Sequence, residues 1–225
     1  MGRKLFYFVL FVGVALVATT GYSQSGDGFS YLEKYNQRMD SIKNYSSTFT
    51  VRTDINSLDV PDVKGKMFFK WPAHYSIAID GFAVLPKHKL TPLARFLSRS
   101  DFKALMLTTE KVNGQLCQVI ELTPVDTASQ VDHYTIWVDK KVYVVRRMLM
   151  IEKDKSEFMY QYIYKTNSDL LPVKLNYTFE YTNKNAGPVL YNQLWHERKP
   201  AEPLLVKGNL IVEFQYYDVR REGDK

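Results

Sequence analysis

The sequence predicts a mainly β protein of the α+β class. We expect a strongly curved antiparallel sheet, or open half-barrel, of about 9 to 11 strands wrapped around an N-terminal helix and a short second helix. From Tyr45 onward, apolar residues recur at every second position, which is the period of a strand with one buried face. Residues 30–42 show helical spacing instead. So many strands exceed what a flat sheet holds before it curls, and the helix needs a sheet to cover its apolar stripe.

The N-terminus has the pattern of a secretory signal peptide. Arg3 and Lys4 precede an apolar run at 5–18, which small residues follow. The run is about 14 residues long, shorter than the roughly 20 that span a bilayer, and no cysteine stands at its end for lipid attachment. We therefore expect residues 1–23 to be a cleaved signal peptide and residues 24–225 to be a single exported domain.

Composition and charge are those of an ordinary globular protein. The chain has 225 residues, of which 45% are hydrophobic and 24% charged. Its net charge of +6 falls to +4 with removal of the signal peptide, and the charges are spread along the chain, so we expect no nucleic-acid partner. Cys117 is the only cysteine, which excludes an internal disulfide, and its strand-like surroundings predict a small buried apolar residue.

The first helix is predicted from a capping box, in which Ser30 is the N-cap and Glu33 reaches back to it. The helix is expected to run to about Ile42. Its apolar stripe consists of Leu32, Tyr35, Met39 and Ile42.

The next two strand runs share an apolar face. Residues 45–55 form the first, and the second continues to Trp71, with Lys64, Lys66 and Lys70 on its opposite face. Phe68 breaks the alternation. Pro72 interrupts the ladder, and the alternation then resumes until the turn at 80–81. The side chains expected to line an apolar ligand cavity are Phe49, Val51, Met67, Phe69, Trp71, Tyr75 and Ile77.

Residues 91–97 predict the short second helix, with Pro92 at its first turn. Asn113-Gly114 predicts a tight hairpin between strands at 105–108 and 115–122. The second half is almost all strand-patterned, with runs at 134–138, 142–152, 158–164, 175–181 and 210–217.

The segment 183–208 is long for a loop, contains three prolines and predicts a lid or binding loop. The expected lid residues are Leu93, Phe96, Leu97, Leu194 and Trp195.

The sequence contains no pattern typical of catalysis or metal binding. The histidines are far apart, and no nucleophile, phosphate-loop or Cys/His motif occurs. We expect no cofactor, no metal and no enzymatic activity. The remaining signal is the aromatic content of 16 Tyr, 13 Phe and 3 Trp. Aromatic residues of this number fit either the packed core of a curved sheet or an apolar cavity for an acyl chain.

The order and spacing of several short motifs resemble those of the LolA-like outer-membrane lipoprotein-sorting proteins of Gram-negative bacteria. The motifs lie at 39–46, 65–72, 80–86, 122–124, 136–139 and 171–172. The resemblance implies an open curved barrel with helices as a lid over a hydrophobic cavity for lipoprotein acyl chains or other lipids. The chain departs from the family at Ala73-His74-Tyr75-Ser76, where the carrier proper has an arginine that helps to hold the lid, and the hairpin at 80–86 is compressed.

We therefore predict a periplasmic carrier or binding protein that acts as a monomer in outer-membrane lipoprotein or lipid sorting. The resemblance also implies membrane-bound proteins that deliver and accept the ligand. The main alternative is a periplasmic sensor or protein-interaction module with a filled core. A glycan binder with stacking aromatic residues is a third possibility.

Overall fold

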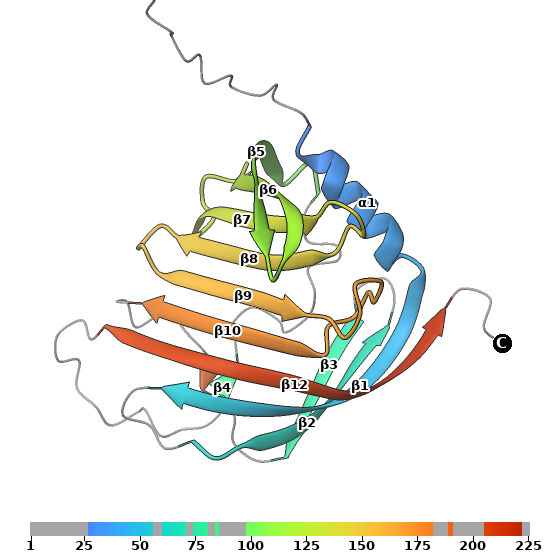
Figure 1. Ribbon diagram of the computed structural model, residues 1–225. Coiled ribbons are helices and arrows are strands. Elements are labelled where there is room, and N and C mark those ends of the chain that lie inside the picture. Colours follow the sequence, from blue (N-terminus) through green and yellow to red (C-terminus); the bar gives the residue numbers. More distant parts are fainter. Residues whose placement is uncertain are drawn as a thin grey trace, which may run out of the picture.

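The computed structural model describes residues 27–55, 60–70, 74–80, 84–85, 98–181, 189–190 and 205–221. These residues form one helix and one large antiparallel sheet that curls strongly (Figure 1). The sheet has ten strands in the order β3-β2-β1-β12-β10-β9-β8-β7-β6-β5. Its two end strands, β3 and β5, do not pair with each other, so the sheet is open. The predicted mainly β fold, an open and strongly curved antiparallel sheet with an N-terminal helix, is confirmed, while the short second helix predicted at 91–97 lies outside the described residues.

The strands from β5 to β10 follow one another in the sheet as they do in the chain, whereas β12 inserts between β10 and β1. The β1–β12 pairing extends from Ile42 opposite Arg221 to Ile55 opposite Gly208. A separate short ladder joins β4 (Val84–Leu85) to β11 (Val189–Leu190). The strands of the large sheet are β1 (Ile42–Ile55), β2 (Val63–Lys70), β3 (His74–Asp80), β5 (Phe102–Val112), β6 (Gln115–Pro124), β7 (Val131–Asp139), β8 (Val145–Glu152), β9 (Glu157–Ile163), β10 (Lys174–Tyr181) and β12 (Val206–Arg221).

The helix, α1 (Phe29–Met39), begins and ends earlier than predicted. Ser30 is not the N-cap: Gly28 holds that position, and the Asp27 carboxylate accepts a hydrogen bond from the backbone N–H of Phe29 at 3.0 Å. Glu33 does not complete a capping box either, because its carboxylate accepts a hydrogen bond from Arg99 Nε at 2.8 Å. The predicted end near Ile42 is also wrong, since Ile42 is already the first residue of β1.

The apolar stripe of α1 lies against the inner face of the sheet. Phe29, Leu32, Tyr35 and Met39 are all buried, and they belong to the same hydrophobic cluster as the inner-facing residues of the strands. The predicted role of the helix, to cover the curved sheet, is therefore confirmed.

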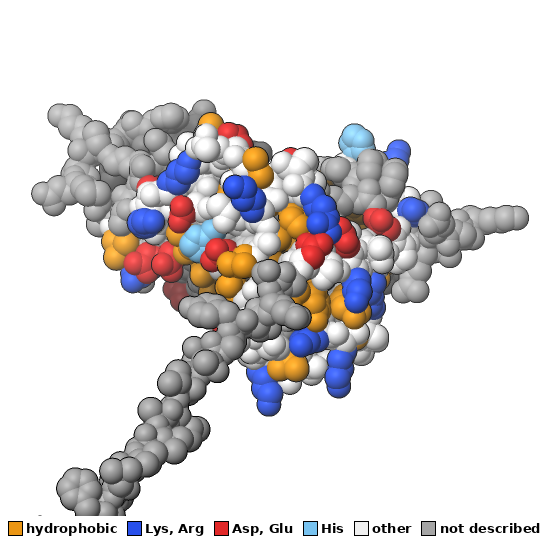
Figure 2. Space-filling model, turned by 90° about the horizontal axis from the view of Figure 1, so that it is seen from above, with side chains coloured by type: hydrophobic (Ala, Val, Ile, Leu, Met, Phe, Trp, Pro, Cys, Tyr) orange, Lys and Arg blue, Asp and Glu red, His pale blue; other side chains and the backbone are white. Residues whose placement is uncertain are grey.

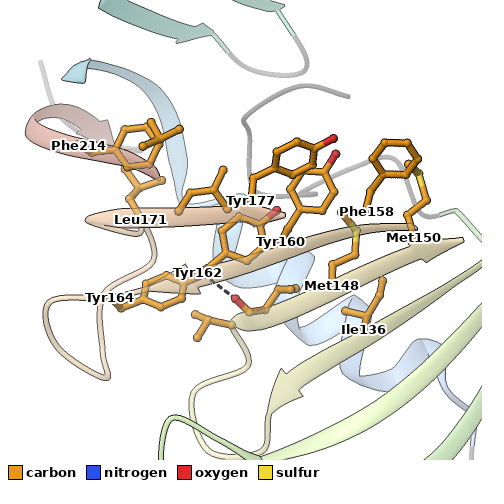
Figure 3. Packing of buried hydrophobic residues seen from close by; sticks show 14 of the residues in the cluster. Ile136, Met148, Met150, Phe158, Tyr160, Tyr162, Tyr164, Leu171, Tyr177 and Phe214 are labelled. Carbon is orange, nitrogen blue, oxygen red and sulfur yellow. Dashed lines mark hydrogen bonds between the residues drawn. The ribbon is translucent and has the colours of Figure 1, made fainter. Parts of the chain in front are cut away.

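Buried aromatic rings cover the inner face of β9 and β10 (Figure 3). Phe158, Tyr160, Tyr162 and Tyr164 alternate with more exposed residues, as predicted. The ring centroids of Tyr160 and Tyr177, which lie opposite each other on the two strands, are 4.7 Å apart. Contacts of this kind stabilise the core beyond simple area burial.

The hairpin between β5 and β6 is the one that the sequence predicted. Asn113 and Gly114 both have positive φ, 50° and 77°, as a two-residue type I′ turn requires. Cys117, on β6, is fully buried in a second small cluster with Val119 and Trp137. Burial raises the pKa of the Cys117 thiol to about 11, which keeps the thiol protonated at neutral pH. Its predicted structural role is confirmed.

The predicted turn after Asp139 is present and is longer than expected. Strand β8 begins at Val145 rather than at Val142, because Tyr143 takes a positive φ of 49° within the turn. The Asp139 carboxylate accepts hydrogen bonds from the backbone N–H groups of Lys141 and Val142 at 2.8 and 3.1 Å. It also pairs with Arg146 at 2.9 Å, and both side chains are almost fully buried. This ion pair was not predicted.

The buried pair gives a test of the fold. Replacing Arg146 by Met leaves the Asp139 carboxylate buried without its cation, and we expect the free energy of unfolding to fall by about 3–5 kcal/mol. Urea denaturation measures the change. In the matched control, Lys207→Gln, the 2.7 Å pair with Glu180 is at the surface, so the loss should be below about 1 kcal/mol. Equal losses in the two variants would contradict this account.

Candidate functional site

A hollow of about 570 Å³ lies where β2 ends and β3 begins, together with the adjoining parts of β1 and β12. This volume falls within the range of small-molecule sites in proteins. We call it the rim hollow, because residues from both faces of the sheet line it. The lining residues are Asn44, Tyr45, Ser46, Phe68, Phe69, Lys70, His74, Tyr75, Ser76 and Asp218.

The inner side of the rim hollow is aromatic. Tyr45, Phe69 and Tyr75 lie directly opposite one another on β1, β2 and β3. The rings of Tyr45 and Phe69 are stacked with centroids 5.1 Å apart, and Tyr217 of β12 packs edge-on against Tyr45 at 5.8 Å. Four strands thus supply one continuous aromatic surface.

The outer side of the rim hollow is polar, with one exception. Ser46, Phe68 and Ser76 form the adjoining cross-strand row, and Asp218 extends it on β12. Phe68 stands in the middle of this row and is 49% exposed. The break in alternation at Phe68 therefore marks an aromatic side chain that the sheet leaves in contact with solvent.

Charges of both signs border the rim hollow. Lys70 and His74 are a cross-strand pair on the outer face, and Asp218 is also exposed. The face of the molecule in Figure 2 likewise shows basic and acidic side chains interspersed, with hydrophobic side chains between them. The rim hollow combines an apolar wall with polar and charged groups, which suits an amphipathic ligand.

Comparison with known proteins bears on this geometry. No family model and no curated protein matches the chain. Among solved structures, it is similar to a LolA superfamily protein from Nitrosomonas europaea, with 11% identity and a TM-score of 0.52 over 88% of this chain and 96% of the other. It is also similar to a DUF1329 family protein from Desulfovibrio piger, with 11% identity and a TM-score of 0.53 over 87% and 94%.

The chain has a LolA-like fold. The resemblance that the sequence motifs indicated is confirmed at the level of architecture, as a divergent variant of that fold. At 11% identity the comparison speaks for the fold alone.

Within this LolA-like fold, the residues predicted to line a cavity share one face but have different environments. Phe49, Val51 and Met67 are each about 1% exposed and form part of the core. Phe69, Tyr75 and Ile77 are half-buried and pack against that core. Of these residues, Phe69 and Tyr75 line the rim hollow. Trp71 and the predicted lid residues Leu93, Phe96, Leu97, Leu194 and Trp195 lie outside the described residues.

Phe49 is held by its neighbours as a core residue is. A Cβ atom added at Gly65 on β2 would lie 2.5 Å from the Phe49 ring, so the ring rests directly on the glycine backbone. On the other side, Phe214 of β12 packs edge-on at 6.4 Å. Phe49 therefore fills space between β2 and β12.

Sequence reasoning missed several lining residues, among them Tyr45, Phe68, His74 and Asp218. Only the exposed Phe68 left a signal, as a break in the apolar alternation. Within the described ranges, no group of three or more His, Cys, Asp or Glu side chains could hold a metal ion. No helix there is long and apolar enough to cross a membrane.

Substitution of two phenylalanines distinguishes a residue of the core from a residue of the rim hollow. Phe49→Ala should lower the free energy of unfolding by about 3–5 kcal/mol, since it opens a cavity in a packed core. Phe68→Ala should change it by no more than about 0.5 kcal/mol, because that side chain is half in solvent. Urea unfolding of the two variants measures both. A stable Phe49→Ala variant with weakened ligand binding would instead assign Phe49 to a ligand cavity.

Proposed function

We propose that this protein is a periplasmic lipid-binding or carrier protein that holds the acyl chains of a lipoprotein or another lipid. The acyl chain lies against the inner face of the sheet, which it reaches through the rim hollow. The observation that carries the proposal is the junction within the hollow. There, a half-buried aromatic wall (Phe69 and Tyr75) meets polar outer residues (Lys70 and His74).

Burial along the inner face differs between the two ends of the sheet. On β9 and β10, inner side chains such as Phe158 and Leu175 are fully buried. On β3, which is an edge strand of the large sheet, Tyr75, Ile77 and Ile79 remain half-buried although they are apolar or aromatic. Each methylene of an acyl chain that covers such a surface contributes about 0.8 kcal/mol. An acyl chain is therefore a fitting occupant of the inner face near β3.

The remaining parts of the proposal rest on the sequence. The signal pattern at residues 1–23 supports export of a single domain, 24–225, and the LolA-like fold is compatible with the periplasm. The membrane-bound proteins that would deliver and accept the ligand stay a prediction, as do the monomeric state and the absence of enzymatic activity. The lid residues stay a prediction as well.

The alternative, a sensor or interaction module with a filled core, is favoured by one observation. Phe49, Val51 and Met67, three of the residues expected to line a cavity, are buried against protein atoms. Under this alternative the rim hollow is a surface depression and binds no acyl chain.

Ligand binding distinguishes the two functions. Native mass spectrometry of the protein purified gently from its host should show co-purifying lipid, and a fluorescent fatty-acid probe should bind the delipidated protein. A clean apo mass together with no probe binding would contradict a carrier.

Phe69→Ala removes part of the aromatic wall, so we expect the affinity for the probe to fall about tenfold, as the loss of roughly 1.4 kcal/mol of apolar contact requires. Leu105→Ala is the matched control, because Leu105 is a large exposed apolar residue on β5, at the other edge of the sheet. Its affinity should equal that of the unmodified protein. A Phe69→Ala variant that binds the probe normally would move the site away from the rim hollow.

A further inference from the structure

Among the residues that the structure describes, the hydroxyls of Tyr35 of α1 and Tyr75 of β3 are buried without a hydrogen-bond partner, as is the Tyr160 hydroxyl of β9. The Tyr35 side chain is only 2% exposed. Buried polar groups in proteins are nearly always hydrogen-bonded, because burial strips a hydroxyl of its water without compensation. The Tyr75 hydroxyl, which belongs to a residue that lines the rim hollow, therefore calls for an explanation.

The Tyr35 and Tyr75 hydroxyls belong to one tyrosine cluster. Burial raises the pKa of Tyr35 and of Tyr75, and the neighbouring phenols of Tyr45 and Tyr162 raise both further. Tyr35, Tyr45 and Tyr162 are buried in one hydrophobic cluster, and Tyr75 packs against it. The phenols are protonated at neutral pH and are hydrogen-bond donors there.

Other members of the cluster are satisfied by the protein itself. The Tyr164 hydroxyl, which follows Tyr162 along the inner face (Figure 3), donates to the backbone oxygen of Val145 at 2.9 Å. The Tyr217 hydroxyl donates to the backbone oxygen of Pro172 at 2.7 Å. Within the described part of the chain, Tyr164 and Tyr217 thus have an acceptor in the protein, whereas Tyr35 and Tyr75 have none.

Tyr75 lies at the rim hollow, where the proposed ligand enters. Its cross-strand neighbour on the inner face is Phe69, which stacks on Tyr45. The charged residues of the hollow, Lys70, His74 and Asp218, alternate onto the outer face instead. The acceptor that best fits beside Tyr75 is therefore an uncharged oxygen attached to an apolar chain.

We propose that Tyr75 donates a hydrogen bond to the carbonyl oxygen of the ester or amide that joins an acyl chain to its head group. The inference rests on the proposed function and specifies its ligand class as acylated lipids, as opposed to ether-linked or plain hydrocarbon chains.

Two neutral probes of equal chain length test the inference: a monoacylglycerol, which has an ester carbonyl, and the corresponding alkylglycerol ether, which lacks it. The full-length mature protein should bind the ester about tenfold more tightly, as one net hydrogen bond predicts. Tyr75→Phe should remove this preference and leave the affinity for the ether unchanged. It should also raise the melting temperature of the ligand-free protein, because a buried hydroxyl without a partner is gone.

Tyr164→Phe is the matched control, since the Tyr164 hydroxyl already donates to the backbone oxygen of Val145 and the residue does not line the rim hollow. It should lower the melting temperature and keep the ester preference. Tyr35→Phe should raise the melting temperature as Tyr75→Phe does.

The outcomes separate this inference from the function on which it rests. Equal affinity of the unmodified protein for ester and ether would overturn the inference and leave lipid binding intact. A Tyr75→Phe variant that retains the ester preference would also overturn it. Failure of both probes to bind would instead overturn the proposed function.

Discussion

The structure depends on one constraint: a very wide antiparallel sheet that is apolar on one face must curl until that face is covered. Helix α1 supplies part of the cover, because its buried residues pack in the same cluster as the inner face of the strands. Aromatic side chains supply much of the remainder, since a ring spans the gap that curvature leaves between distant strands. Where the cover is complete, between β6 and β10, the inner residues are core. On β3 the same alternation leaves Tyr75, Ile77 and Ile79 half-buried.

The fold was predictable because apolar and polar residues alternate within each strand, so the local sequence shows which side chains are buried. Tyr45, Phe49 and Val51 alternate with polar residues, and all three are buried as expected. The helix boundaries were less predictable, since competing caps decide them. Ser30 and Glu33 have the right spacing for a capping box. However, the Asp27 carboxylate accepts a hydrogen bond from the backbone N–H of Phe29, and Arg99 donates one to the Glu33 carboxylate. Arg99 is distant in the sequence, so no local pattern reveals its effect.

The rim hollow was predictable only in part, because its residues meet through strand register. Phe69 and Tyr75 follow from alternation within neighbouring strands. Asp218 reaches the hollow only because β12 inserts beside β1, opposite Ser46. The buried Asp139–Arg146 pair escaped prediction for a similar reason: the turn chemistry of Asp139 explained the residue without a partner. The cavity prediction likewise grouped Phe49 and Met67 with Phe69 and Tyr75 because they share a face, although the first two are core residues and the last two are half-buried.

The pairing of β1 with β12 also determines when the protein can fold. Strand β1 (residues 42–55) pairs along its length with β12 (residues 206–221). This pairing cannot form until almost the whole described chain has been synthesised. Contacts of such long sequence separation form slowly, because a large loop must close before any of them stabilises the chain. During synthesis the N-terminal part emerges first. Strands β1 to β3 then expose their apolar face while β12 is still to come, which favours aggregation. A chain with this topology places a lasting demand on the chaperones of the compartment in which it folds.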